Sequence, residues 1–217
     1  MYRKGGAQMI AGTAAVLILG YLTGSIPTAV WAGKLIIRDD IRNHGSGNAG
    51  ATNVFRVMGW KPALLVMIID IGKGMLSVLL WPCLFHAYPD LLTVQILAGS
   101  AAVLGHIWTV FAGFRGGKGV GTAFGVLLAL APLASAATLI VWIALVAAFR
   151  IVSIGSLAAG IVFPLALTAQ RHWLDPDLPQ TLIWTGVVLG VLIFFTHRRN
   201  IVRLLQGKEN RFGKEKQ

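Results

Sequence analysis

The sequence predicts an all-α polytopic membrane protein with about seven transmembrane helices, several of them short or broken. Composition supports this fold class, because 56% of the 217 residues are hydrophobic and only 12% are charged. Soluble domains usually carry about a quarter charged residues. In addition, the apolar residues form long segments that short polar stretches separate. At this length a single domain is expected over residues 1–217.

The long apolar segments give the expected spans, since a transmembrane helix needs about 20 apolar residues. The first covers residues 9–31 and lacks a small-residue cleavage site after it, so a retained helix is expected. Gly24 and Pro27 interrupt it, which is tolerable only where neighbouring groups satisfy the freed backbone. The remaining segments lie at 62–84, 91–111, 120–149, 151–168 and 181–196.

Segment 120–149 is long enough for one tilted helix or for two short ones. Pro132 near its middle would break or kink a helix. The distribution of basic residues decides between one helix and two, because cytoplasmic loops carry an excess of Lys and Arg. With two helices, one side collects all of the 19 Lys and Arg residues except Arg3, Lys4, Lys73 and Arg171. The bias therefore favours the higher helix count, with the N-terminus outside and a basic cytoplasmic tail over about 197–217.

The stretch SGNAGATNVFR, from Ser46 to Arg56, is the longest run of small and hydrogen-bonding residues in the chain. It contains Asn48, Thr52 and Asn53 and has no apolar anchor until its last three positions. In a chain this hydrophobic, such a run predicts a site for a small polar ligand.

A second polar stretch, GFRGGKG at 113–119, precedes the apolar segment that begins at Val120. Glycines let backbone N–H groups approach an oxyanion, a helix N-terminus adds partial positive charge, and Lys118 supplies a full one. The alternative is a flexible turn whose lysine follows the charge bias. A Walker A loop is excluded because Gly119 follows the lysine, so nucleotide hydrolysis is not expected.

Ionisable residues inside the apolar segments are candidates for function. Asp70 and Lys73 are three positions apart, so they share a helix face and can pair; we expect an ion pair that supports the site. His106 either supports the site as well or is a packing histidine with a satisfied hydrogen bond. Ser153, which follows Arg150, either lines the site or permits close helix contact.

The tail begins THRRNIVRLLQGKEN, in which His197, Asn200 and Arg203 recur at a spacing of three. They would present one polar stripe if the last helix continues past the membrane. The alternative is a basic segment attracted to anionic lipid headgroups. For His197 and Asn200 we expect a role in the site, because asparagine adds nothing to lipid attraction.

Several chemistries have no matching motif in the sequence. It contains no G-x-S-x-G elbow and only one cysteine, Cys83. No cofactor and no metal are expected. Although the net charge is +11, the basic residues lie between apolar segments, so nucleic acid is not an expected partner. The remaining polar groups suit the binding and neutralisation of anions.

These motifs together resemble the acyl-phosphate:glycerol-3-phosphate acyltransferase family, the PlsY type of bacterial membranes. SGNAGATNVFR resembles its first signature, GHIWTVFAGFRGGKGVGT its second and HRRNIVRLLQGKEN its third, while GSIPTAVWAGKL and DIGKG also fit. The resemblance covers nearly the whole chain. Thr109 and Gly121 stand where proline and alanine are common, which affects only local packing.

The resemblance implies transfer of a fatty acyl group from acyl phosphate to the sn-1 hydroxyl of glycerol 3-phosphate. The products would be lysophosphatidic acid and phosphate, in the first step of bacterial phospholipid synthesis, without a covalent acyl-enzyme. It implies a multi-pass protein of the bacterial cytoplasmic (inner) membrane whose active site faces the cytoplasm. A soluble enzyme that forms acyl phosphate is a further expected partner. The alternative is an organic-phosphate transporter or binding protein, although the chain shows no matching inverted halves.

The resemblance also implies roles for individual residues, with a substrate phosphate oxygen accepting the proton. The expected catalytic residues are Ser46, Thr52, Asn53, Arg56, Lys118, His197 and Asn200. The expected phosphate-binding residues are Ser46, Asn48, Arg56, Gly116, Gly117, Lys118, Gly119 and Ser153. The expected supporting residues are His106, Asp70, Lys73, Arg150 and Glu209.

Overall fold

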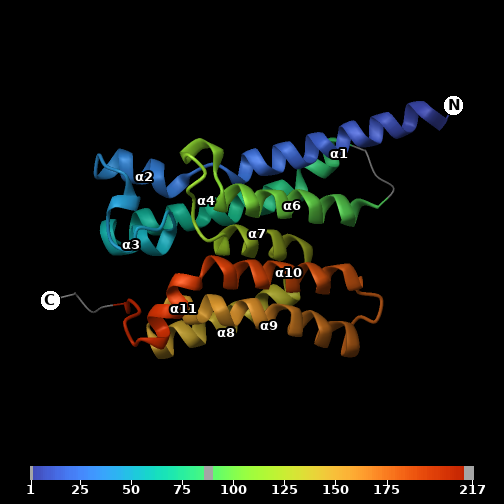
Figure 1. The fold of residues 1–217 in the computed structure, drawn as a ribbon. Helices are drawn as coiled ribbons and strands as arrows, with labels where there is room; N and C mark the ends of the chain where they lie inside the picture. Colours follow the sequence, from blue (N-terminus) through green and yellow to red (C-terminus); the bar gives the residue numbers. More distant parts are fainter. Residues whose placement is uncertain (1, 86–89, 213–217) are drawn as a thin grey trace. The chain divides into compact units, whose positions relative to one another are not determined.

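The computed structural model describes residues 2–85 and 90–212, and every regular element within them is a helix (Figure 1). The chain divides into two compact units, residues 1–130 and 131–217. The first unit contains α1 (Tyr2–Gly24), α2 (Thr28–Ile36), η1 (Ile41–Asn43), α3 (Ala51–Met58), α4 (Trp60–Leu79), α5 (Trp81–Leu84), α6 (Leu91–Ile107), η2 (Val110–Ala112) and α7 (Val120–Leu130). The second contains α8 (Pro132–Phe149), α9 (Val152–Trp173), α10 (Gln180–Thr196) and α11 (Arg198–Leu205).

The first apolar segment is broken where the sequence predicted an interruption. Helix α1 ends at Gly24 and α2 begins at Thr28, so Ser25, Ile26 and Pro27 form a short non-helical link. Gly24 is required for packing as well, because a Cβ built on it would lie 1.9 Å from the carbonyl oxygen of Ala102 in α6. The break therefore lies directly against α6.

Glycines also bring α4 and α7 close together. A Cβ on Gly74 would lie 2.2 Å from the Thr122 carbonyl oxygen, and one on Gly125 would lie 2.0 Å from that of Ile71. Small residues at such contacts let membrane helices approach backbone to backbone. This contact fixes the start of α7, and with it the glycine-rich stretch at 113–119, beside the α4 turn that carries Asp70 and Lys73.

Within the described parts of the chain, five helical segments are long and apolar enough to cross a membrane, namely Met9–Ile36, Trp60–Leu84, Leu91–Ala112, Pro132–Phe149 and Val152–Trp173. Helices α10 and α11, which are bent by 62°, add a sixth if they count as one span. Segment 120–149 divides at Pro132 into α7 and α8, as predicted. Because α7 rises only about 16 Å, against a hydrocarbon core of about 30 Å, the expected count of about seven includes one helix too short to span by itself.

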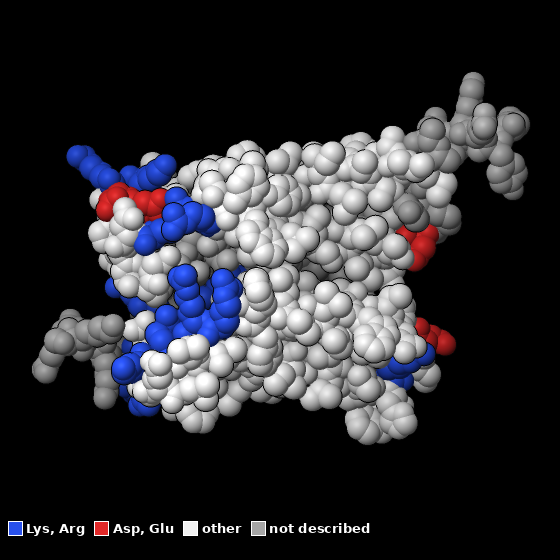
Figure 2. Space-filling model, viewed as in Figure 1, with Lys and Arg blue, Asp and Glu red and all other residues white. Residues whose placement is uncertain are grey.

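Basic side chains are unevenly distributed in the first unit. In Figure 2, Lys and Arg gather at the end of this unit where α2 and α3 lie, whereas its middle is almost free of charge. The polar stretch 46–56 belongs to this basic end, since it runs from the loop after η1 into α3. The expectation of a single domain over residues 1–217 stays a prediction, as does the orientation of the two termini.

Candidate active site

The polar stretch 46–56 forms a loop that its own Asn53 organises. Asn53, in the first turn of α3, is 1% exposed. Its Oδ1 accepts hydrogen bonds from the Ser46 amide at 2.7 Å and the Ser46 hydroxyl at 3.1 Å. Its Nδ2 donates to the carbonyl oxygens of Ile41 at 3.1 Å and His44 at 3.0 Å. Asn53 uses both its acceptor and its donor capacity to shape the loop, rather than facing a ligand as the sequence suggested.

The other expected residues of this stretch lie along the loop and α3. Ser46, Asn48 and Thr52 are all half-buried, and Arg56 is half-buried in the last turn of α3. Because Arg56 is at most half accessible, its guanidinium combines a full charge with partial shielding from water. That combination suits it to hold an anion at the basic end of the first unit.

Arg42 joins this loop to the second polar stretch. Its Nη1 donates to the carbonyl oxygens of Ala112 at 2.8 Å and Arg115 at 2.9 Å, while its Nε lies 2.9 Å from Asp40 Oδ1. The hydrogen bond from Arg42 holds the pKa of the Asp40 carboxyl below its usual value of 3.8. In the sequence Arg42 is recognisable only as a basic loop residue, because such a contact between distant loops leaves no local pattern.

Asp70 and Lys73 form the predicted ion pair inside α4. Lys73 Nζ lies 2.8 Å from Asp70 Oδ1, and both side chains are at most 5% exposed. Lys73 Nζ also donates to the carbonyl oxygen of Ile26 at 2.9 Å, and the Thr28 hydroxyl donates to Asp70 Oδ1 at 2.6 Å. The pair therefore satisfies backbone and side-chain groups at the break between α1 and α2, as a buried charge pair requires.

The glycine-rich stretch is bonded to the end of α6 more tightly than its sequence indicated. The Gly116 amide donates to the Ile107 carbonyl at 3.0 Å, and the Gly117 amide donates to the His106 carbonyl at 3.1 Å. These two amides thus cap α6 in this structure, so their expected role as phosphate donors does not fit their placement. Lys118 and Gly119 remain the candidates from this stretch, and Gly119, with a φ of 83°, immediately precedes α7.

Thr109 anchors the loop between α6 and the glycines. It is 2% exposed, and its hydroxyl donates to the carbonyl oxygen of Ser25 in the helix break. The Tyr21 hydroxyl donates to the neighbouring carbonyl of Trp108 at 2.5 Å. Although Thr109 was expected to matter only for local packing, its hydroxyl connects this loop to the break in the first membrane segment.

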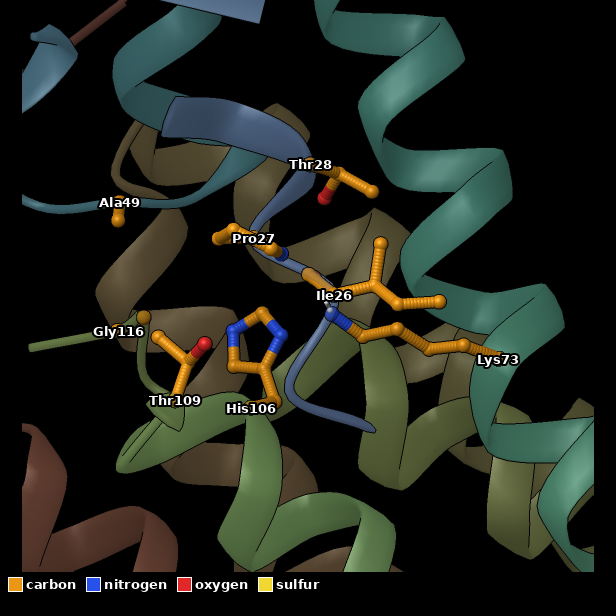
Figure 3. A pocket seen from close by; sticks show the side chains of 9 residues that line it. Ile26, Pro27, Thr28, Ala49, Lys73, His106, Thr109 and Gly116 are labelled. Carbon is orange, nitrogen blue, oxygen red and sulfur yellow. Dashed lines mark hydrogen bonds between the residues drawn. The ribbon is translucent and has the colours of Figure 1, made fainter. Parts of the chain in front are cut away.

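A small pocket in the first unit brings these parts together (Figure 3). The imidazole of His106 lies between Thr109 and Lys73, with Pro27 on a neighbouring side. His106 is 7% exposed, and its Nδ1 lies 3.6 Å from Asp70 Oδ1. The lining residues are Ile26, Pro27, Thr28, Ala49, Lys73, His106, Thr109, Gly116 and Gly117. The helix break, the α4 pair, both polar stretches and α6 therefore meet at one place.

The expected residues of the tail and of the segment after Arg150 lie in the second unit. Glu209, whose side chain is 3% exposed, accepts hydrogen bonds from Asn200 Nδ2 and Arg203 Nε, each at 2.7 Å. His197 Nδ1 lies 2.8 Å from the Ile193 carbonyl oxygen, to which a protonated Nδ1 donates. The polar stripe predicted for the tail is thus held in place by Glu209, at the start of a helix bent away from α10.

Arg150 and Ser153 lie at the junction between α8 and α9. Arg150 is exposed, has a φ of 57°, and its carbonyl accepts a hydrogen bond of 2.8 Å from the Phe212 amide. Ser153 is 5% exposed, and no hydrogen bond from its Oγ is found among the described residues. A buried hydroxyl without such a bond is compatible with the predicted ligand contact.

These features define an integral membrane protein whose apolar helices carry charged and amide side chains within them and near their ends. The chain matches the family model described as glycerol-3-phosphate acyltransferase over residues 14–207, and it belongs to that family. This membership accords with the three polar motifs that suggested it.

Relatives and solved structures agree with this membership. The chain is 42% identical to the glycerol-3-phosphate acyltransferase of Chlorobaculum tepidum, over 93% of this chain and 97% of that protein. It is 41% identical to that of Chlorobium luteolum, over 92% and 97%. The crystal structure of PlsY (YgiH) in its glycerol 3-phosphate form has a TM-score of 0.80 at 38% identity, covering 93% of this chain and 96% of that one. Its lysophosphatidic acid form has a TM-score of 0.79.

Proposed function

We propose that this protein transfers a fatty acyl group from acyl phosphate to the sn-1 hydroxyl of glycerol 3-phosphate. The observation that carries the proposal is the match to the acyltransferase family over residues 14–207. The solved relatives described as glycerol 3-phosphate and lysophosphatidic acid forms support the acceptor and the product. Acyl phosphate as donor is supported by the anion-binding residues, which suit two phosphate-bearing substrates.

The reaction needs no covalent acyl-enzyme, because the mixed anhydride of acyl phosphate is already activated. The glycerol hydroxyl oxygen forms a bond to the acyl carbonyl carbon, and the bond between that carbon and the bridging phosphate oxygen breaks. Phosphate leaves with the bonding electrons, and a substrate phosphate oxygen takes the hydroxyl proton. Protein groups are then required mainly to position and neutralise the two phosphates.

Arg56 and Lys118 are assigned to phosphate neutralisation, supported by their positive charge and partial burial. Ser46, Asn48, Thr52 and Ser153 are assigned to hydrogen bonds with the substrates. His197 and Asn200 are assigned to closing the glycerol phosphate pocket. Asn53 and Glu209 act by holding the loop and the tail.

The protein is proposed to lie in the bacterial cytoplasmic membrane with its active site and C-terminus on the cytoplasmic side. Support comes from the basic residues in alternate loops, which follow the charge bias of membrane proteins. A soluble enzyme that makes acyl phosphate would then meet the site on the same side. Both substrates are within reach there, one from water and one from the bilayer.

Purified protein reconstituted in lipid tests the function. Phosphate should be released from acyl phosphate only when glycerol 3-phosphate is present, and lysophosphatidic acid should form in equal amount. Accumulation of organic phosphate inside the vesicles without turnover would instead identify a transporter.

A further inference from the structure

We infer that Asp70, Lys73 and His106 form a positioning network for the glycine loop that presents Lys118, with His106 acting through Nδ1. Lys118 is assigned to phosphate in the proposed function, so this inference rests on that function. The network holds the loop and does not itself contact substrate. Three successive contacts connect the helix break to the glycine loop.

The first step joins Lys73 to the break. Its ammonium donates to the Ile26 carbonyl at 2.9 Å and lies 2.8 Å from Asp70 Oδ1. Non-helical backbone at membrane depth is tolerated only where other groups satisfy it. Lys73 supplies that partner, and Asp70 balances its charge. Both side chains therefore bind other groups of the protein rather than substrate.

The second step joins Asp70 to His106. A single oxygen, Oδ1, accepts hydrogen bonds from the Thr28 hydroxyl at 2.6 Å and from Lys73, and it lies 3.6 Å from His106 Nδ1. No hydrogen bond to this Nδ1 is found within residues 2–85 and 90–212, and the atom is buried. Asp70 is the carboxylate that faces this nitrogen, at a distance longer than a hydrogen bond, so an electrostatic contact with a proton on Nδ1 would orient the imidazole.

The third step joins His106 to the loop. Its carbonyl accepts the Gly117 amide, and a Cβ built on Gly116 would lie 1.9 Å from that carbonyl oxygen. A Cβ built on Gly117 would lie 2.3 Å from His106 Nε2. Both the backbone and the ring of His106 thus lie against the glycines. A rotated imidazole would push directly on the residue before Lys118.

Two substitutions of His106 separate the two ring nitrogens. In His106→Asn the amide occupies the position of Nδ1 and can present an N–H toward Asp70. In His106→Gln the amide occupies the position of Nε2 and loses that donor. We expect His106→Asn to keep kcat within about threefold of the unmodified protein and His106→Gln to lower it about tenfold, with a smaller change in KM for the acyl donor. The reverse order would identify Nε2 as a substrate contact and overturn the inference.

Coupling to Lys118 provides the second readout. Residues in one network give non-additive losses. If Lys118→Arg and His106→Gln each reduce kcat/KM about tenfold, the double variant should lose far less than the roughly hundredfold loss expected from independent effects. A fully multiplicative loss would contradict a shared action. Thr122→Val is the matched control, since it also removes a buried polar group of this unit that lacks a hydrogen bond among the described residues.

Hydrogen exchange makes the test independent of turnover. The Gly116 and Gly117 amides should exchange faster in His106→Gln than in His106→Asn or Thr122→Val, at unchanged thermal stability. Equal exchange in all three overturns the network whether or not the protein is active. An unmodified protein that shows no acyl transfer while this exchange pattern holds would overturn the proposed function and leave the network standing.

Discussion

The side-chain amide of Asn200 donates a hydrogen bond of 2.7 Å to Glu209, a carboxylate whose other oxygen lies 2.7 Å from Arg203. Glu209 thus joins the residues after α11 back onto that helix. Hydrogen bonds to charged groups contribute about 1.5–3 kcal/mol each. Removing this carboxylate leaves a buried amide and a guanidinium without their shared acceptor.

Glu209→Ala should therefore lower both thermal stability and acyl transfer, because Asn200 and α11 lose their anchor. Glu209→Gln should be intermediate, since its side-chain oxygen can still accept from Asn200 whereas its amide nitrogen cannot accept from Arg203. Differential scanning fluorimetry in detergent, together with phosphate release, measures both effects. Unchanged melting temperatures for both variants would refute the anchoring role.

Asn53→Ala should destabilise the loop 46–56 by about 1–3 kcal/mol, because the carbonyls of Ile41 and His44 lose their shared buried donor. Activity should fall with it, since the loop carries Ser46 and leads to Arg56. Asn43→Ala is the matched control, because Asn43 is exposed and its amide makes a 3.1 Å hydrogen bond to Asp39. Chemical denaturation of both variants compares them directly, and equal stability would contradict the role given to Asn53.

Gly117→Ala should reduce turnover about a hundredfold, since a Cβ there would lie 2.3 Å from His106 Nε2 and 2.7 Å from the Ala49 carbonyl oxygen. The loop before Lys118 would have to move to relieve this clash. Gly72→Ala provides the control within α4, where a Cβ meets nothing within 4 Å. Steady-state acyl transfer by the two variants should differ widely. Comparable rates would show that the loop can shift to accommodate the added Cβ without loss of activity.

Arg56→Ala and Lys118→Ala should each abolish measurable turnover. Loss of one group that stabilises the charge on a reacting phosphate costs about 3–4 kcal/mol, which corresponds to roughly 10²–10³ in rate. Lys61→Ala is the matched control, because Lys61 is an exposed basic residue in the first turn of α4. Initial rates of phosphate release measure the effect, after a folding check by size-exclusion chromatography. A folded Lys118→Ala protein with normal activity would remove Lys118 from the site.

The link between Asp40 and Arg42 should weaken in acid. The pKa of Asp40 in the folded protein is held below 3.8, chiefly by the hydrogen bond from Arg42. A lowered carboxyl pKa contributes stability that is present above the unfolded value and is lost as pH falls through the folded pKa. Asp40→Asn should flatten the pH dependence of thermal stability below about pH 4. An unchanged slope in that range would assign the effect to other carboxylates.

Hydropathy, the distribution of basic residues and local spacing predicted the features that can be recognised from the order of residues along the chain. The helical fold, the break near Gly24 and Pro27, the division at Pro132 and the Asp70–Lys73 pair all follow from such patterns. The three motifs suggested the family, and the match over residues 14–207 bears this out. The roles given to individual site residues stay predictions.

Contacts between distant segments could not be predicted in the same way. A glycine loop that binds an anion and one that caps a helix have the same composition, and only the structure shows the Gly116 and Gly117 amides bonded to α6. Asn53 suits a ligand contact equally well until its partners in the loop are known. Arg42 reaches carbonyls about seventy residues away, a separation that no local pattern records.

The hydrogen bond between Lys73 and the carbonyl of Ile26 also bears on how the chain enters the membrane during synthesis. An intrahelical ion pair and an unsatisfied carbonyl are each costly in hydrocarbon. Neither the first segment, with its break after α1, nor α4, with its lysine, is therefore favourable in the bilayer by itself. When both are present, the Lys73 ammonium donates to the Ile26 carbonyl and satisfies it. The translocon would be expected to retain the first segment until the second arrives and to release the two into lipid as a hairpin.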